Sequence, residues 1–271
     1  MATDRFLLDK SVFIATSAQE LCSFAEKHTV ILPETLFYEC YTSPELSDRK
    51  LFKRLHQLLK AGTYLSYQMM QIVGDEGKNL CPCTSIIDYS WTEKLRANLL
   101  REEDTIAKDQ IARIKNDRSK IAMAVVKLAK RSKGLESKQP GYLKEIRSLK
   151  MDRKQRFRKW IEIADQNNIH DLAVNSFRRY AIDPGQFSLS SEWLSWHYMR
   201  LMYAFSFEYS YLEAIGGCPM GEKAENDFMD IAYLAFFAKA DVLLMKDVNL
   251  EVARVAFPNK KVYSSIHEIN G

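Results

Sequence analysis

The sequence predicts an α/β protein with a central parallel sheet that is interrupted by a long, basic helical insertion. Strand and helix patterns alternate over 1–60 and again over 220–265, whereas the stretch between them is helical in pattern. Such alternation is typical of parallel strands covered by helices. We therefore expect two halves of one α/β domain, at 1–90 and 201–271, with a helical insertion at 91–200.

Short apolar runs mark the expected strands of the N-terminal half. Residues 6–8 are apolar and end at Asp9, the pattern of a buried parallel strand that delivers a polar group at its carboxyl end. Pro33 stops the next run, and Gly62 ends the last helix. The strands are expected at 6–8, 29–32 and 63–69, and the helices at 17–27, 34–41 and 51–60.

An aromatic-rich segment at 175–215 leads into the C-terminal half of the chain. Aromatic side chains at helical spacing most often pack in a core, so we expect core packing here. Base stacking against a single-stranded nucleic acid is the alternative. Beyond this segment, helices are expected at 227–238 and 250–256, and strands at 241–245 and 261–263.

The middle of the chain is basic and has the pattern of an antiparallel helical hairpin. Apolar residues at spacings of three and four predict amphipathic helices at 107–128 and 143–164, with a turn at Pro140-Gly141. Between 94 and 159 there are 21 Lys and Arg residues against 8 Asp and Glu residues. This imbalance favours binding of nucleic acid, whereas a solvated helix surface is the alternative. The candidate nucleic-acid contacts are Arg147, Lys150, Arg153, Lys154, Arg156, Arg158 and Lys159.

Cysteine usage and hydropathy exclude several other classes of protein. The five cysteines are irregularly spaced and 1–10 lacks the pattern of a secretory signal, so we expect a reduced, cytoplasmic protein. The Cys81-Pro82-Cys83 segment is too tight for half of a zinc site, and the five histidines match no metal-ligand spacing. The most apolar stretch, 228–245, contains three charged residues, so we expect no transmembrane helix and no membrane partner.

Acidic residues follow the expected strands at both ends of the chain. Asp9 follows the first strand, and Asp247 follows the strand at 241–245. Glu39 lies in the helix after the second strand, and Asp230 lies in the helix before the late one. Functional groups of an open parallel sheet gather outside the carboxyl ends of its strands. Clustered carboxylates repel one another unless a cation joins them, and oxygen ligands alone favour Mg²⁺ or Mn²⁺.

Three motifs of the chain resemble those of PIN-domain ribonucleases. Residues 7–14, LLDKSVFI, resemble the opening strand with its Asp, and 32–39, LPETLFYE, resemble the helix that carries a Glu. The longest match, NDFMDIAYLA at 226–235 with ADVLLMKD at 240–247, is similar to the helix and strand that each present an Asp. The resemblance implies a three-layer α/β/α domain with a central parallel sheet.

By this resemblance a set of carboxylates would serve as catalytic metal ligands. The implied ligands are Asp9, Glu39, Asp230 and Asp247, with Asp227 as an additional member and Ser11 as a hydrogen-bonding support for Asp9. Lys10 and Ser11 depart from the usual Thr-Asn-like pair, and Asn249 stands where many relatives have a further Asp. The large basic hairpin is a third departure, since small toxin-type members lack it.

Each acidic residue also has a purely structural interpretation. Asp9 could cap the helix that follows it, and Asp227 could cap the helix at 227–238. Glu34 could take the place of Glu39, and Asp230 could simply suit the positive end of a helix dipole.

The resemblance implies a metal-dependent endoribonuclease whose basic hairpin binds RNA. The alternative from another class is a scaffold protein that keeps the fold without catalysis and docks a protein partner through the hairpin. A third alternative is that the hairpin serves as a homodimerisation arm.

Overall fold

The fold is built on a five-stranded sheet in which every strand is parallel to its neighbours. The computed structural model describes residues 4–42, 50–100, 150–166, 189–215 and 222–269 of the chain. The strands are β1 (Arg5–Leu8), β2 (Thr29–Leu32), β3 (Tyr64–Leu65), β4 (Val242–Leu244) and β5 (Lys261–Tyr263), in the spatial order β3-β2-β1-β4-β5. The predicted α/β class with a central parallel sheet is therefore confirmed.

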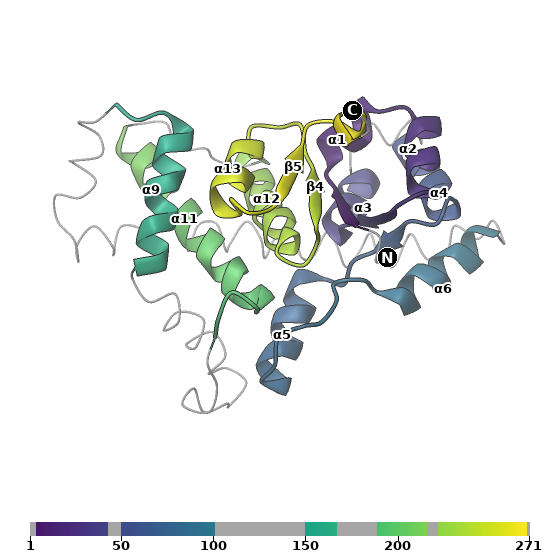
Figure 1. The fold of residues 1–271 in the computed structure, drawn as a ribbon, viewed down its shortest axis with the longest axis horizontal. Coiled ribbons are helices and arrows are strands. Elements are labelled where there is room, and N and C mark those ends of the chain that lie inside the picture. The colour runs from purple at the N-terminus through teal and green to yellow at the C-terminus, as the bar shows by residue number, and fades with distance from the viewer. Residues whose placement is uncertain (1–3, 43–49, 101–149, 167–188, 216–221, 270–271) are drawn as a thin grey trace.

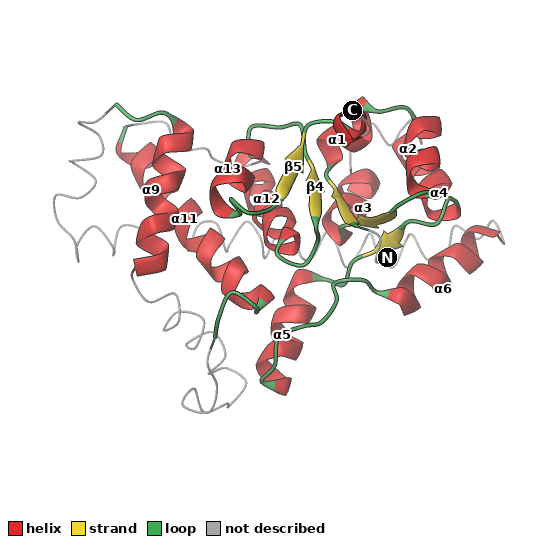
Figure 2. Cartoon of the chain, viewed as in Figure 1, coloured by secondary structure: helices red, strands yellow, loops and turns green. Residues whose placement is uncertain are grey.

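Helices surround this sheet (Figure 2). Successive residues of β1, β2 and β4 are buried although they point to opposite faces, so both faces of the sheet are covered. The described helices are α1 (Lys10–Ala15), α2 (Ala18–Ala25), α3 (Glu34–Thr42), α4 (Lys50–Lys60), α5 (Met69–Asn79), α6 (Tyr89–Leu100), α9 (Arg153–Gln166), α11 (Leu194–Ala214), α12 (Glu222–Phe237), α13 (Leu250–Ala256) and the 3₁₀ helix η4 (Ile266–Ile269).

The third strand is shorter than the sequence predicted. The expected strand at 63–69 is reduced to Tyr64–Leu65, and Met69 already begins α5. The reason is a change of partner, because Ser66 forms an antiparallel bridge with Ile87. The prediction was therefore wrong beyond Leu65.

The strand order changes direction between β1 and β4, and this is the point where functional groups gather in open parallel sheets. The chain moves from β1 outward to β2 and β3, then returns to the other side of β1 to form β4 and β5. Leu8 pairs with Leu244, and the Asp9 N–H donates to the Leu244 carbonyl at 2.9 Å. The residues that follow the two strands are thus neighbours although they come from opposite ends of the chain.

Helices α9 and α11 lie at one end of the molecule. Figure 1 shows α9 and α11 at one end of the long axis, α2, α4 and α6 at the other, and the sheet between them. Helix α9 packs against both α11 and α13, and α11 packs against α12. The Trp160 ring stacks on Phe207 with centroids 5.3 Å apart, and Phe157 meets Phe205 edge-on at 4.9 Å.

Aromatic residues of α11 belong to the hydrophobic core, which confirms the predicted core packing for the described part of the segment. The buried members are Tyr198, Phe205, Phe207, Tyr209 and Tyr211, and Trp193, which directly precedes the helix, is buried as well. The start of α11 is held by Glu76, whose buried carboxylate accepts hydrogen bonds from the Leu194 and Ser195 N–H groups at 3.0 and 2.8 Å. A carboxylate at this position also suits the positive end of the helix dipole.

The predicted hairpin can be located only in part. Its first helix, at 107–128, its turn and Arg147 lie outside the described residues. The second helix, predicted at 143–164, is present as α9 from Arg153 to Gln166. The expected boundary between 200 and 201 falls inside α11. Within the described ranges, no helix combines the length and the apolar character needed to cross a membrane.

Lys260 holds the carboxyl end of α12, the helix that carries Asp227 and Asp230. Its ammonium group donates to the carbonyls of Phe237, Ala238 and Ala240 at 2.7–2.8 Å. Lys260→Met would leave these carbonyls without their charged donor, so we expect a loss of about 2 kcal/mol in the free energy of unfolding. Urea denaturation measures this loss.

The matched control for this experiment is the neighbouring exposed residue Lys261. It makes only a long, exposed ion pair with Asp4, so Lys261→Met should change the free energy of unfolding by less than about 1 kcal/mol. Equal losses in the two variants would contradict the capping role of Lys260.

Candidate metal centre

Asp9 lies at the centre of the carboxyl edge of the sheet and is almost fully buried, with 2% of its surface exposed. It caps α1, since its Oδ2 accepts the Ser11 N–H at 2.7 Å and also the Ser11 hydroxyl. The Ser11 Oγ in turn accepts the Lys246 N–H at 2.8 Å, which links the ends of β1 and β4. The capping role of Asp9 is therefore real, but both bonds fall on Oδ2 and so use only one of its two oxygens.

Asn249 joins two further carboxylates. Its backbone N–H donates to Asp247 Oδ1 at 2.7 Å, and its side-chain amide donates to Asp230 Oδ2 at 2.6 Å. Only 1% of its surface is exposed. Asn249 thereby holds the carboxylate that follows β4 beside the one presented by α12.

Glu39 approaches from α3 and is held by two donors. The Tyr233 hydroxyl donates to Oε2 at 3.0 Å, and Lys10 forms an ion pair with Oε1 at 3.5 Å. The alternative residue Glu34 instead accepts a hydrogen bond from Gln68 at 2.8 Å. Glu39, and not Glu34, is the glutamate that acts electrostatically on the other carboxylates.

Asp227 lies one turn before Asp230 on α12 and accepts a hydrogen bond from the Tyr209 hydroxyl at 2.8 Å. Helix α12 begins at Glu222, so Asp227 lies in its second turn and the alternative cap role is wrong. The same boundary places Asp230 beyond the first two turns, where the positive end of the helix dipole has little effect.

Burial and mutual repulsion raise the pKa values of these carboxyl groups. Burial, and then repulsion by Asp247 and Glu39, raise the pKa of Asp9 to about 7. Burial, followed by repulsion from Asp247 and the other carboxylates, puts the pKa of Asp230 well above its usual range. Burial also raises the pKa values of Glu39 and Asp247. The carboxylates therefore interact electrostatically with one another.

The donor set fits a hard divalent cation, although the carboxylates lie too far apart to hold one as they stand. No three His, Cys, Asp or Glu side chains in the described part of the chain are grouped closely enough for that. Electrostatic repulsion acts over longer distances than a bond of about 2.1 Å from Mg²⁺ to oxygen. The carboxylates can therefore raise one another's pKa values without lying close enough to share an ion. Among the described residues, two cations act on the cluster: Lys10 pairs with Glu39, and Arg153 acts on Asp247.

Hydrogen bonds within the described part of the chain leave one oxygen each of Asp9 and Asp230 without a donor. Hydrogen bonds from described residues reach Asp9 and Asp230 at Oδ2, and Asp247 at Oδ1. Among the described residues, no hydrogen bond reaches the opposite oxygen of Asp9 or Asp230, whereas the Leu250 backbone also acts on the Asp247 carboxylate.

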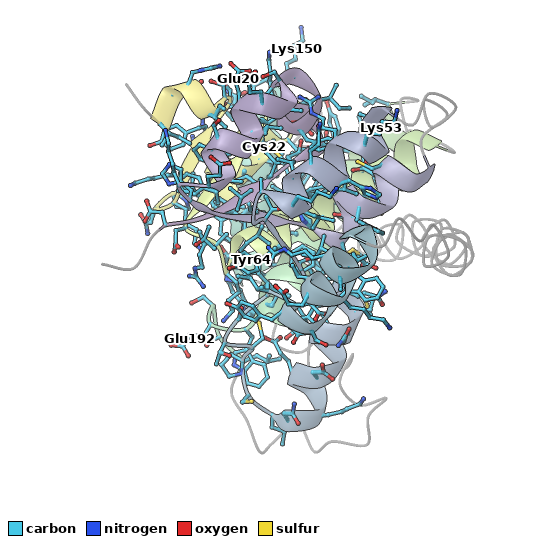
Figure 3. The ribbon with its side chains drawn as sticks, turned by 90° about the vertical axis from the view of Figure 1, so that its right-hand side faces the viewer. Glu20, Cys22, Lys53, Tyr64, Lys150 and Glu192 are labelled. Carbon is cyan, nitrogen blue, oxygen red and sulfur yellow. The ribbon has the colours of Figure 1, made fainter. Side chains whose placement is uncertain are left out.

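Most of the predicted nucleic-acid contacts on α9 have partners within the protein. Arg156 forms a buried, two-pronged ion pair with Glu208 at 2.6 and 3.0 Å. Arg153 donates to Asn249 at 2.7 Å, Lys154 pairs with Glu251 at 2.5 Å, and Lys159 pairs with Glu162 at 3.7 Å. Lys150 and Arg158 are exposed, and the Lys150 side chain points away from the ribbon (Figure 3).

The structure also brings in residues that sequence reasoning missed. Asn249 was noted only as a missing acid, and Tyr233 only as part of an apolar helix. The spacing of three between Asp230 and Tyr233 places both on one side of α12, which was the available signal for Tyr233. No local signal connects Arg153 with Asn249, which lie 96 residues apart.

Comparisons with known proteins identify no relative of this chain. No protein-family model, no curated protein and no solved structure matches it.

Proposed function

We propose that this chain is a metal-dependent nuclease of the PIN-like type that hydrolyses phosphodiester bonds at the carboxylate cluster. The observation that carries the proposal is the gathering of Asp9, Glu39, Asp230 and Asp247 where the strand order reverses. Their charges repel one another and are only partly offset by Lys10 and Arg153. Such a cluster is costly unless a cation completes it.

The carboxylates have distinct parts in this proposal. Asp9 and Asp247 are the central ligands, Asp230 is the third, and Glu39 binds directly or through water. Bound Mg²⁺ or Mn²⁺ would supply an activated water and stabilise the leaving oxygen. Ser11 fixes the orientation of Asp9, and Tyr233 fixes that of Glu39. Asp227, held by Tyr209, adds negative charge behind Asp230 and Asp247.

RNA is the substrate that we propose, on the basis of the resemblance to PIN-domain ribonucleases. The excess of Lys and Arg between 94 and 159 favours attraction of a phosphate backbone. Lys150 and Arg158 are exposed candidates on or beside α9, whereas the exposed Lys154 pairs with Glu251. Binding through such residues is expected to weaken with salt and to show little sequence preference.

A binding protein without turnover is the second candidate, and two observations favour it. Lys10 already pairs with Glu39, and a neutral Asn249 occupies a position beside two carboxylates. Both features reduce the net negative charge that attracts a second cation. The scaffold and homodimer alternatives for the basic segment also belong to this candidate.

Manganese-dependent cleavage of single-stranded RNA tests the proposed activity. Asp9→Asn and Asp247→Asn are each expected to reduce the cleavage rate by at least about 100-fold, because each removes a metal ligand. Asp75→Asn is the control, since Asp75 is exposed on α5. Undiminished cleavage in both ligand variants would overturn the assignment. Calorimetric Mn²⁺ binding without cleavage by the unmodified chain would instead favour the binding protein.

A further inference from the structure

We propose that Arg153 is a positioning residue of the carboxylate cluster and acts through Asn249 on Asp230 and Asp247. The inference rests on the proposed function, because it concerns the same cluster. It goes further by making α9, a helix outside the sheet and its flanking α/β elements, part of the site.

The Asn249 amide has a donor end and an acceptor end, and its two partners can each pair with only one of them. A guanidinium group can only donate and a carboxylate can only accept, whereas an amide has one end of each kind. Arg153 Nη2 donates to Asn249 Oδ1 at 2.7 Å, and Asn249 Nδ2 donates to Asp230 Oδ2 at 2.6 Å. Arg153 therefore determines which end of the amide faces Asp230.

The Asn249 side chain is buried, so water cannot readily replace Arg153 as its partner. Asn249 has only 1% of its surface exposed, so solvent has little access to Oδ1 if the guanidinium is removed. An unsatisfied buried carbonyl oxygen is costly, so without Arg153 the amide would be held in its present orientation by Asp230 alone and would be less firmly fixed.

Contacts of α9 hold Arg153 itself in place. Its guanidinium lies over the Phe157 ring, 5.3 Å from the centroid. The adjacent Lys154 pairs with Glu251 of α13 at 2.5 Å, and α9 packs along α13. Helix α13 begins at Leu250, directly after Asn249, so these contacts keep α9 in register with the residues that follow β4.

The positive charge of Arg153 lies near the carboxylates without pairing directly with one of them. Arg153 acts electrostatically on Asp247, yet its hydrogen bond goes to Asn249 and not to a carboxylate. Lys10, in contrast, pairs directly with Glu39. Arg153 thus orders the carboxylates without occupying the oxygens that a cation would need.

The Asn249 side-chain amide gives a direct test of positioning in the metal-free protein. We expect its two N–H resonances to be well separated and slow to exchange with solvent in the unmodified chain. Arg153→Met should accelerate this exchange at least about 10-fold, since the amide loses its fixed partner. Arg153→Lys should restore part of the protection, and Arg158→Met, on the exposed side of the same helix, should have no effect. Unchanged exchange in Arg153→Met would overturn the inference.

Manganese affinity supplies the second readout, and its sign is informative. Removing a positive charge would by itself tighten cation binding, whereas loss of positioning should weaken it by about 10-fold. Calorimetry on Arg153→Met, Asn249→Ala and the double variant is expected to show weaker binding in each single variant. The double variant should bind no more weakly than Asn249→Ala, because Arg153 acts through Asn249. Tighter binding in Arg153→Met, or additive losses, would overturn the inference.

The two proposals fail in different ways. An unmodified chain that neither binds Mn²⁺ nor cleaves RNA overturns the proposed nuclease. If the amide still responds to Arg153→Met in that case, the positioning of Asp230 and Asp247 by Arg153 stands by itself.

Discussion

Asp9→Asn is expected to stabilise the metal-free protein at pH 8 by about 2 to 4 kcal/mol in the free energy of unfolding, although it removes a proposed ligand. Asp9 is buried beside other carboxylates, and its pKa is raised from 3.8 to about 7. An asparagine has no charge to desolvate and can still accept the Ser11 N–H. Neutral residue 9 also relieves the repulsion on Asp230.

The sign of the pH dependence follows from the raised pKa of Asp9. Between pH 3.8 and about 7 the folded state retains a proton that the unfolded chain releases. The contribution of Asp9 to stability therefore falls as the pH rises through this window and is lowest above it. Asp9→Asn should have little advantage near pH 4 and its full advantage at pH 8. Urea denaturation at both pH values, with a chelator present, measures the difference.

A substitution of an exposed aspartate serves as the control for Asp9→Asn. Asp75→Asn, at an exposed position of α5, should not alter the pH dependence. Adding Mn²⁺ should stabilise the unmodified chain more than Asp9→Asn, because an ion that binds only the folded state stabilises it by mass action. A variant that is less stable than the unmodified chain at pH 8 without metal would contradict the electrostatic account.

Glu208→Ala is expected to lower the free energy of unfolding by about 3 to 5 kcal/mol, the second large effect. Glu208 of α11 accepts two hydrogen bonds from Arg156 and one from the Trp160 indole at 2.9 Å. The Arg156 and Glu208 side chains are only 12% and 5% exposed. Loss of the carboxylate would remove the acceptor of the Trp160 indole N–H and two of the acceptors of Arg156, and α9 would lose one of its polar links to α11.

A double variant separates the ion pair from the packing around it. Arg156→Met with Glu208→Leu removes both charges and should recover the part of the loss that comes from the unpaired guanidinium, because apolar replacements of buried ion pairs are often neutral. Urea denaturation of the single and double variants measures the recovery. A double variant as unstable as Glu208→Ala would contradict the proposed cause. The same ion pair explains why Arg156, basic in sequence, is a poor candidate for a nucleic-acid contact.

The main strands and the placement of the carboxylates were accessible from the sequence for a physical reason. Buried parallel strands are short apolar runs, and the polar residue that ends each run marks the carboxyl edge of the sheet. Asp9 and Asp247 follow such runs, so their common edge could be predicted. The strand predicted at 63–69 was too long, because its strand-like sequence pattern continues past Leu65. At Ser66 the chain instead changes partner to Ile87.

The details of the cluster depend on contacts that no local pattern encodes. In the sequence, Asn249 is notable only because it stands where many PIN-domain proteins have an Asp. In the fold, its amide links Asp230 to Arg153. The cap interpretation of Asp227 failed because α12 begins at Glu222, earlier than its apolar pattern indicates. Charge counting also could not distinguish the exposed Arg158 from the paired Arg156, since the partner Glu208 lies in a distant segment.

The most direct test of the central claim is a crystal structure of the unmodified chain with Mn²⁺, located by its anomalous scattering. The account predicts at least one ion at the carboxyl edge of β1 and β4, with oxygens of Asp9, Asp230 and Asp247 among its ligands. The side chains should rotate inward from their present open arrangement. An ion bound elsewhere, or no ion at the cluster under conditions that support RNA cleavage, would contradict it.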